Sequence, residues 1–159
     1  MSKKIIIIRG PLGVGKTTIA QKLAKILNAQ HIQIDKVLSE NNMGQVGDIS
    51  LVDFLKVNEL ILPKLKKILA ANGTALIDHN FYYKEQLDDL KDKIGDVVVI
   101  DLKAKLATCI KRDEARERVY GKEAATAVYN LVSNFDYGIP INTEHKDVDA
   151  IVANILTLL

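Results

Sequence analysis

The sequence predicts a three-layer α/β/α protein, in which helices cover both faces of a five-stranded, mainly parallel sheet. Short, continuous apolar runs alternate along the chain with longer segments whose apolar residues recur at helical spacing. The runs lack the polar alternation of half-exposed strands, which is typical of parallel strands buried on both faces. Because the 159 residues are 48% hydrophobic, we expect one domain with a substantial core and right-handed crossovers between its strands.

Five segments are expected to form the strands. The clearest is Lys4–Arg9, whose isoleucines combine high β-propensity with an unbroken apolar run. The others, in chain order, span residues 32–34, 74–78, 97–102 and 137–142. The last is the weakest, because Pro140 lacks an amide hydrogen and favours the edge or the end of a sheet.

Helical periodicity is found at residues 17–27, 50–71, 84–91, 105–118, 122–133 and 147–158. The second of these segments opens with Ser50 and Asp53 in the spacing of a capping box. It is expected to kink or split at Pro63 and to end at Asn72-Gly73. The polar stretch 39–50 is expected to form a mobile loop within the domain.

Composition excludes several classes of protein. With 22 Lys and Arg against 20 Asp and Glu, the net charge of +2 argues against a protein that coats nucleic acid by charge. The single cysteine, Cys109, excludes an internal disulfide framework, and no zinc-cluster spacing is present. The apolar run behind Lys3-Lys4 is shorter than a signal peptide requires, or than the about 20 residues of a membrane span. We therefore expect a cytoplasmic protein of a reducing compartment, with no membrane partner.

The motif that indicates function is Gly10-Pro-Leu-Gly-Val-Gly-Lys-Thr17, which fits G-x-x-x-x-G-K-[ST] between an expected strand and an expected helix. Its glycines allow backbone N–H groups to surround phosphate oxygens. Lys16 would place a positive charge on the β and γ phosphates, and Thr17 would ligate Mg²⁺. The positive end of the following helix would point at the same oxygens. The motif therefore predicts that the chain binds a nucleoside triphosphate with Mg²⁺.

Two aspartates follow expected strands and are candidates for chemistry near the γ-phosphate. Asp35 ends the short second strand, where its carboxylate could orient or deprotonate an acceptor hydroxyl. Asp78 closes the apolar run before it in the position of a Walker B aspartate, near Mg²⁺ or its waters. The alternative for each is a helix cap. His79 and Asn80 follow Asp78 and are either substrate contacts or ordinary packed or exposed side chains.

A third cluster is the run of arginines at 112, 116 and 118. Arg112 and Arg116 stand four residues apart and are expected to share one helix face, where they could neutralise charge during phosphoryl transfer. Gly121 is expected to stop this helix or to act as the hinge of a closing lid. The alternative is a solvated helix with a Glu114–Arg118 pair.

In chain order these motifs resemble those of the small P-loop kinases. That group includes 5′-hydroxyl polynucleotide kinases, zeta-toxin-like and antibiotic phosphotransferases, and adenylylsulfate kinases. The matching residues are the phosphate loop, Asp35, Asp78, Cys109-x-x-Arg112-Asp113-x-x-Arg116 and Ile141-Asn142-Thr143. Two departures concern the acceptor rather than the reaction: Asn142 replaces a frequent aspartate, and His79-Asn80 follow Asp78 where a small residue and Thr or Asn are common.

The resemblance implies the P-loop NTPase fold with strand order 2-3-1-4-5, ATP as the donor and transfer of its γ-phosphate to a hydroxyl group. It also implies a single kinase domain over residues 1–159, with an arginine-bearing helical lid at about 105–133 and an acceptor-side segment at about 36–71. Asp35 would be the base on the acceptor hydroxyl, and the loop at Thr143 would lie near the adenine.

The predicted site residues are of three kinds. The catalytic residues are Lys16, Asp35, Arg112 and Arg116. The nucleotide-binding residues are Gly10, Gly13, Val14, Gly15, Lys16, Thr17, Thr18, Arg112 and Thr143. The residues expected to hold Mg²⁺ are Thr17 and Asp78.

The favoured function is a phosphotransferase that acts on a hydroxyl of a small molecule such as a nucleoside or a sugar. A 5′-hydroxyl polynucleotide kinase is the alternative, since lysines and Phe81-Tyr82-Tyr83 could supply charge and stacking. A GTPase-type switch is disfavoured because no N-K-x-D motif is present, and a non-catalytic nucleotide-binding regulator is the remaining alternative. The sequence leaves the oligomeric state and the exact acceptor open.

Overall fold

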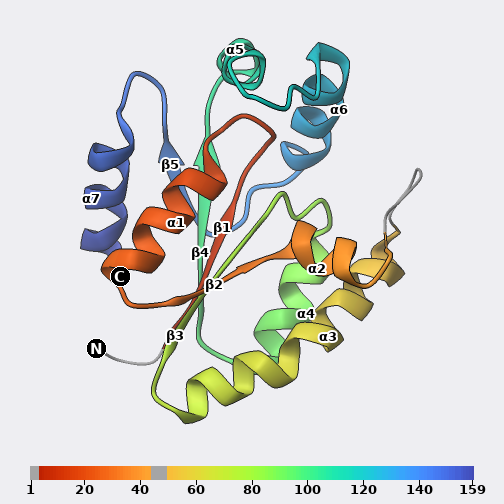
Figure 1. Cartoon of the computed structure of the whole chain (residues 1–159), viewed down its shortest axis with the longest axis vertical. Helices are drawn as coiled ribbons and strands as arrows, with labels where there is room; N and C mark the ends of the chain where they lie inside the picture. Colours follow the sequence, from red (N-terminus) through yellow and green to blue (C-terminus); the bar gives the residue numbers. More distant parts are fainter. Residues whose placement is uncertain (1–3, 44–49) are drawn as a thin grey trace.

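The structure is a computed structural model that describes residues 4–43 and 50–159 of the chain (Figure 1). Its strands are β1 (Lys4–Arg9), β2 (Gln30–Gln33), β3 (Thr74–His79), β4 (Val97–Lys103) and β5 (Ile139–Asn142). Its helices are α1 (Lys16–Ile26), α2 (Ile34–Glu40), α3 (Leu51–Ala70), α4 (Lys84–Ile94), α5 (Leu106–Glu114), α6 (Lys122–Val132) and α7 (Val148–Leu158).

All paired strands run parallel, in the order β2-β3-β1-β4-β5. The central strand is β1, in which Ile7 lies opposite Ile77 of β3 and Val99 of β4. Helices α1 and α7 cover one face of the sheet, helices α3 and α4 cover the other, and α5 and α6 lie beyond the carboxyl end of β1 (Figure 1). The predicted fold class and strand order are therefore confirmed.

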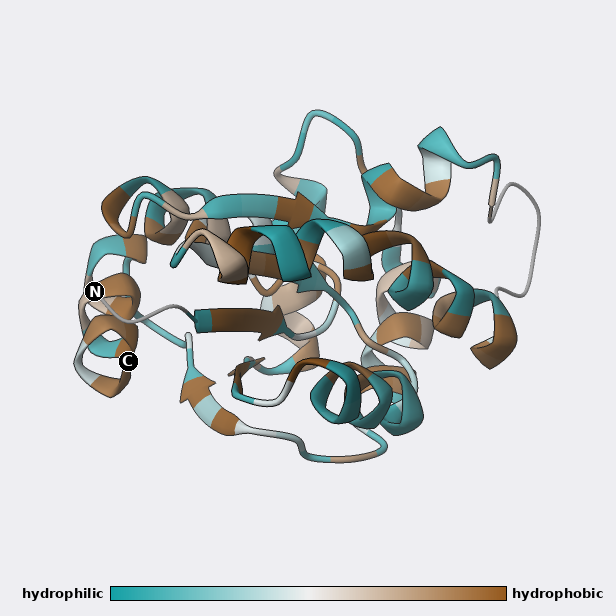
Figure 2. Cartoon of the chain, turned by 90° about the horizontal axis from the view of Figure 1, so that it is seen from below, coloured by the Kyte–Doolittle hydropathy of each residue, from teal (hydrophilic) through white to brown (hydrophobic). Residues whose placement is uncertain are grey.

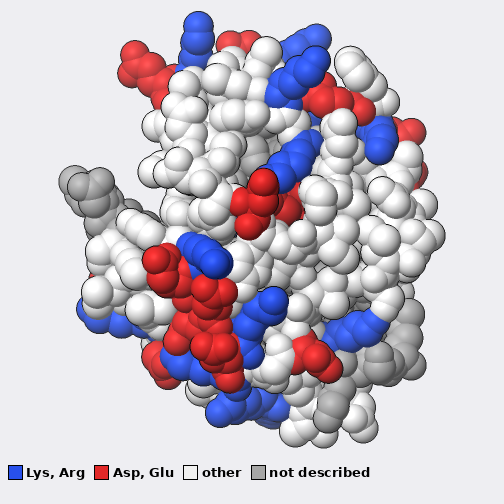
Figure 3. All heavy atoms as spheres, turned by 180° about the vertical axis from the view of Figure 1, so that it is seen from behind, with Lys and Arg blue, Asp and Glu red and all other residues white. Residues whose placement is uncertain are grey.

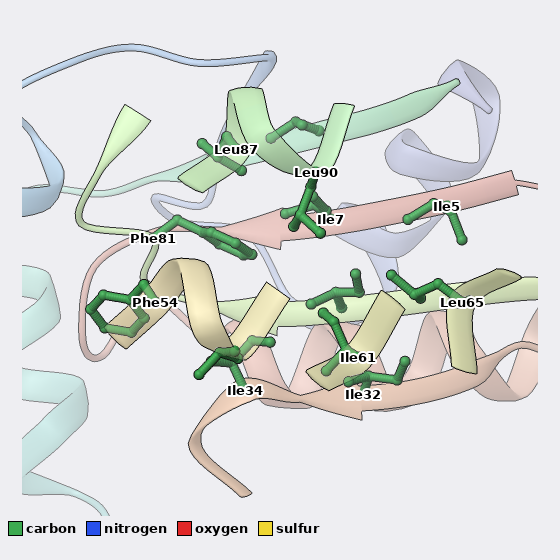
Figure 4. Close-up of a cluster of buried hydrophobic side chains, with 14 of the residues drawn as sticks. Ile5, Ile7, Ile32, Ile34, Phe54, Ile61, Leu65, Phe81, Leu87 and Leu90 are labelled. Carbon is green, nitrogen blue, oxygen red and sulfur yellow. The ribbon is translucent and has the colours of Figure 1, made fainter. Parts of the chain in front are cut away.

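Alternate residues of β1 pack into two separate cores, because successive side chains of a strand point to opposite faces. Ile5 and Ile7 pack against α3 and α4 in one core, part of which is drawn in Figure 4. Ile6 and Ile8 pack against α1 and α7 in the other. In Figure 2 the central strands are mainly hydrophobic, whereas the surrounding helices mix hydrophobic and hydrophilic residues. Burial on both faces explains why the strand runs lack polar alternation.

The structure corrects the expected boundaries of two segments. The second strand ends at Gln33, and Asp35 lies in the first turn of α2 instead of at the end of the strand. The reason is that Ile34 and Leu38, one helical turn apart, are both buried. The polar stretch predicted as a loop is helical up to Glu40, and its residues 44–49 lie outside the described part of the chain.

Helix α3 differs from expectation in being continuous through Pro63. Proline removes one helical hydrogen bond, but Ile61 and Leu65 on either side of it are anchored in the core. The predicted capping box is confirmed, since the Ser50 side chain accepts from the Asp53 N–H and the Asp53 carboxylate accepts from the Ser50 N–H. Within the described residues, no helix is long and apolar enough to cross a membrane.

A buried ion pair joins the carboxyl ends of β1 and β4. Arg9 Nη1 donates to Asp101 Oδ2 at 2.8 Å, and both side chains are almost completely buried. Arg9 Nη2 donates to the carbonyl oxygen of Val132 at 2.6 Å, and its Nε donates to that of Phe81 at 3.4 Å. The Phe135 ring stacks on the guanidinium at 4.1 Å. One side chain therefore connects the central strand to β4, to the end of α6 and to the loop after β3.

We expect Arg9→Met to lower the free energy of unfolding by about 3–5 kcal/mol, because it removes the only fully buried cation beside Asp101 among the described residues and leaves that carboxylate with the partly exposed Lys103, at 2.8 Å. Lys22→Ala is the control, because Lys22 pairs with Asp149 at the surface and should cost less than about 1 kcal/mol. Urea denaturation measures both variants. Equal small losses in the two variants would contradict this account of Arg9.

Candidate active site

The phosphate loop runs from the end of β1 to the start of α1. Helix α1 begins at Lys16, and its N-cap, Gly15, has a φ of +103°. Gly13 has a φ of +84°, and a Cβ atom built there would lie 2.2 Å from the carbonyl oxygen of Cys109 in α5. Since no side chain fits between the loop and α5, the loop passes directly beneath that helix. The first N–H groups of α1 have no partners within the helix, and they favour an anion at the N-terminus of α1, next to the loop.

Lys16 lies across the phosphate loop, where its Nζ donates to the carbonyl oxygen of Pro11 at 2.9 Å. Burial lowers the pKa of Lys16 to about 8, and the nearby Asp78 and Asp35 carboxylates oppose this shift. Arg116 adds a smaller contribution that also lowers the Lys16 pKa. The pKa of the amine is therefore only slightly above neutral pH. A phosphate bound beside it would favour the charged form.

Two neighbouring cavities open beside the loop. The first, of about 310 Å³, is lined by Leu12, Lys16, Thr17, Asp35, Asp78, Asn80, Tyr82, Arg116, Tyr120, Ala124 and Val128. The second, of about 390 Å³, is lined by Gly15, Thr17, Thr18, Arg116, Glu117, Arg118 and Tyr120. Thr17, Arg116 and Tyr120 line both. The predicted phosphate-binding residues thus adjoin a cavity that also receives both predicted aspartates.

Asp78 lies near the end of β3 and is 5% exposed. Its Oδ2 lies 2.5 Å from Nε2 of His31, which comes from the neighbouring strand β2. Asp78 lines the first cavity together with Thr17, so a hydroxyl and a carboxylate face the same space. Both are oxygen ligands of the kind that Mg²⁺ prefers.

Asp35 reaches the same cavity from the first turn of α2, and its side chain is 81% exposed. Its Oδ1 lies 3.3 Å from Nε2 of His79, a residue only 2% exposed. The interaction with His79 lowers the pKa of Asp35, partial desolvation by the neighbouring residues opposes this shift, and the charge of Lys16 adds to it. The carboxylate form, which can accept a proton, is therefore stabilised.

Arg112 and Arg116 do not share one helix face as predicted, because α5 ends at Glu114, before Arg116. Arg112 Nη1 donates to Thr143 Oγ1 at 2.9 Å, and its Nη2 donates to the Thr143 carbonyl oxygen at 2.9 Å. Arg112 also donates to the carbonyl oxygen of Val14 in the phosphate loop, at 3.3 Å. Arg116 lies beyond the helix and lines both cavities. Arg112 thus connects the phosphate loop to Thr143, which is fully buried. Arg116, and not Arg112, lines the cavity beside Lys16.

A buried aspartate that the sequence analysis named only as part of the arginine-containing motif, without a role of its own, shapes this region. Asp113 is 1% exposed and accepts hydrogen bonds from the backbone N–H groups of Tyr120 and Gly121. These bonds fold the chain back after α5 and bring Arg116 and Tyr120 to the cavities. Gly121, with a φ of +97°, is the N-cap of α6 rather than the end of the preceding helix.

Asn80 and Tyr82, from the loop after β3, line the first cavity. Asn80 Nδ2 donates to the Tyr82 hydroxyl at 2.7 Å. The sequence suggests only a stacking role for Tyr82, whereas in the structure its hydroxyl is hydrogen-bonded to Asn80. Phe81 between them is fully buried and is not available for stacking on a ligand.

Comparison with known proteins supports the fold. A family model described as an AAA domain matches residues 5–132. A sugar kinase from Janibacter sp. HTCC2649 has a TM-score of 0.79 at 17% identity, covering 98% of this chain and 93% of that chain. The APS kinase of Mycobacterium tuberculosis, in complex with AMPPNP and APS, has a TM-score of 0.75 at 15% identity, covering 99% of this chain and 97% of that chain. At these identities the likeness shows the fold alone, which is that of small P-loop kinases.

A curated sequence relative is the tRNA dimethylallyltransferase of Thermodesulfovibrio yellowstonii. It is 51% identical over 37 residues, which are 23% of this chain and 12% of the relative. The match spans only a small part of that protein's length.

We expect Gly13→Ala to weaken ATP binding by more than about tenfold and to destabilise the fold by about 1–3 kcal/mol, since its Cβ overlaps the Cys109 carbonyl. Gly95→Ala is the matched control, because Gly95 also has positive φ but open space around its Cβ position. Calorimetric ATP titration and urea denaturation measure both. Equal effects in the two variants would show that glycine is required at position 13 because of its positive φ, and not because of the close approach to α5.

The affinity for Mg²⁺-ATP should fall as the pH rises above about 8, the pKa of Lys16. Below that pH the ammonium is present. Above it, binding must take up a proton, so the affinity should drop by up to about tenfold per pH unit. Calorimetry between pH 7.5 and about 9.5 measures this slope. Lys16→Ala should bind weakly with a flat profile, and a flat wild-type profile would contradict the assignment.

Proposed function

Since the chain belongs to the AAA domain family and has the fold of small P-loop kinases, we propose that it is an ATP-dependent kinase. It transfers the γ-phosphate of Mg²⁺-ATP to a hydroxyl group of a small molecule. The observation that supports this most strongly is the first cavity. Lys16 and Thr17 line one side of it, Asp35 projects into it from α2, and Arg116 lies between it and the second cavity.

Lys16, Arg116 and Asp35 would have different roles in the reaction. The Lys16 ammonium and the Arg116 guanidinium balance the charge of the transferred phosphoryl group. The acceptor oxygen forms a bond to the γ-phosphorus while the bond from that phosphorus to the bridging oxygen of ADP breaks. Asp35 accepts the proton that the acceptor hydroxyl loses.

The residues fit Mg²⁺ as the metal. Residues 4–43 and 50–159 contain no group of three or more His, Cys, Asp or Glu side chains that could hold a metal ion alone. Mg²⁺ does not require such a group, because it commonly binds through one or two side chains, waters and substrate phosphates. Thr17 would hold it together with the phosphates, and Asp78 would act directly or through a water. When bound, the ion neutralises charge on the β and γ phosphates.

Several features favour a small hydroxylated acceptor over a nucleic-acid end. The acceptor side of the cavity presents the Tyr82 hydroxyl and Asn80, and burial raises the pKa of Tyr82 so that its hydroxyl stays protonated. Tyr82 accepts from Asn80 and can donate its own hydrogen to an acceptor oxygen. On the face of the molecule in Figure 3, Lys and Arg side chains are interleaved with Asp and Glu rather than gathered into a basic surface. A nucleic-acid ligand would favour such a surface.

The proposal is tested by transfer of labelled γ-phosphate from Mg²⁺-ATP to pools of acceptors. The pools are sugars, nucleosides, nucleoside monophosphates, adenylylsulfate and 5′-hydroxyl oligonucleotides. We expect a labelled product from a sugar or nucleoside pool, and none with Lys16→Ala. Product from the oligonucleotide pool alone would favour the polynucleotide kinase alternative, and ATP binding without any product would favour a regulator.

Asp35→Asn should lower kcat for the identified acceptor by about 10²–10⁴-fold, because an amide cannot accept the hydroxyl proton. The KM for ATP should change little, since Asp35 acts on the acceptor. Steady-state kinetics measure both constants. Wild-type kcat in this variant would contradict the role of Asp35 as base.

A further inference from the structure

We infer that His79 is a positioning residue that holds the carboxylate of Asp35 in place for the reaction. This inference rests on the proposed function and extends it, because it explains how an exposed side chain on a short helix can act as a base. The observation behind it is the contact between His79 Nε2 and Asp35 Oδ1, at 3.3 Å.

The two partners differ sharply in exposure. His79 is 2% exposed at the end of the central sheet, whereas the Asp35 side chain is 81% exposed. A surface carboxylate on the first turn of a helix has several rotamers available. The contact with a buried, immobile ring therefore selects the position of Asp35, because only one partner can move.

The backbone fixes which nitrogen of His79 carries the hydrogen. The N–H of Phe81 donates to His79 Nδ1 at 3.2 Å, so Nδ1 must be the unprotonated acceptor nitrogen. In the neutral ring Nε2 then carries the hydrogen, and it is Nε2 that faces Asp35. Phe81 has a φ of +53°, a conformation that is costly for a bulky residue. Its fully buried side chain holds the backbone in this conformation.

Aromatic rings prevent His79 from turning. Its ring centroid lies 5.2 Å from that of Phe54, 5.5 Å from that of Phe81 and 5.7 Å from that of Tyr82. Phe54 belongs to α3 and Phe81 to the loop after β3, and both point into the same core (Figure 4). Packing from several sides distinguishes this histidine from one that merely fills space at the surface.

The bond to His79 leaves one oxygen of Asp35 for chemistry. His79 occupies Oδ1, so Oδ2 is the oxygen that receives the proton of the acceptor hydroxyl. The other charged or titratable groups that act on Asp35 are Lys16 from α1 and Tyr82 from the loop after β3. Neither substitutes for His79, because within the described residues Lys16 forms no ion pair with Asp35 and Tyr82 forms no hydrogen bond with it.

The inference is tested with His79→Leu, which removes the donor, and His79→Gln, whose amide can present an N–H in a similar place. We expect His79→Leu to lower kcat by up to about 100-fold with little change in the KM for ATP, and His79→Gln to recover most of the loss. In an Asp35→Asn background, His79→Leu should have almost no further effect. Equal losses in the Leu and Gln variants, or full additivity with Asp35→Asn, would overturn the inference.

A second measurement keeps the inference separate from the proposed activity. Nitrogen-15 spectra of the imidazole in the wild-type protein should show His79 with hydrogen on Nε2 and not on Nδ1. The Nε2 signal should shift in Asp35→Asn. These results would support the contact even if no acceptor were phosphorylated, whereas hydrogen on Nδ1 or an unchanged Nε2 signal would overturn it. Urea denaturation of the His79 variants separates loss of folding from loss of positioning.

Discussion

The buried pair of Arg9 and Asp101 is the interaction on which the arrangement of the site depends. A buried guanidinium is costly unless its N–H groups find hydrogen-bond acceptors and its charge finds a counter-charge. The acceptors of Arg9 come from β4, from the end of α6 and from the loop after β3. That loop contains Phe81, whose N–H in turn donates to His79 Nδ1 and orients the ring. Arg9, at the carboxyl end of the central strand, thus connects the part of the site that contains Arg116 with the part that contains Asp35.

The end of β3 serves both sides of the sheet at once. Consecutive strand residues point to opposite faces, so Asp78 faces the α1 side, where Lys16 and Thr17 lie, while His79 faces the α3 side and contacts Asp35. Under the proposed function, the first residue acts on the donor nucleotide and its metal, and the second acts on the acceptor through Asp35. A shift of one residue in the register of β3 would exchange these roles.

The parts of the fold that were predictable from the sequence are those with strong local signals. The isoleucines of β1, the capping box of Ser50 and the glycine-rich loop each indicate a structure through their own residues. The contact between Asp35 and His79 was not predictable, because it depends on how α2 packs against β3. The direction of Arg116 was missed because the Asp113 carboxylate folds the chain back after α5, a bond between groups seven and eight residues apart that leaves no helical or strand periodicity. Asp101 lies within the expected strand 97–102, but its role depends on Arg9, which comes from far along the chain.

Under the proposed function, the triphosphate of ATP ends in the first cavity, between the phosphate loop and Asp35. A crystal structure with a non-hydrolysable ATP analogue and Mg²⁺ tests it most directly. We expect the γ-phosphate to lie beside Lys16 and the metal to be bound by Thr17. A carboxylate oxygen of Asp35 should face the γ-phosphate across a space open to an acceptor hydroxyl. A γ-phosphate outside this cavity, or one whose approach from Asp35 is blocked by protein, would contradict it.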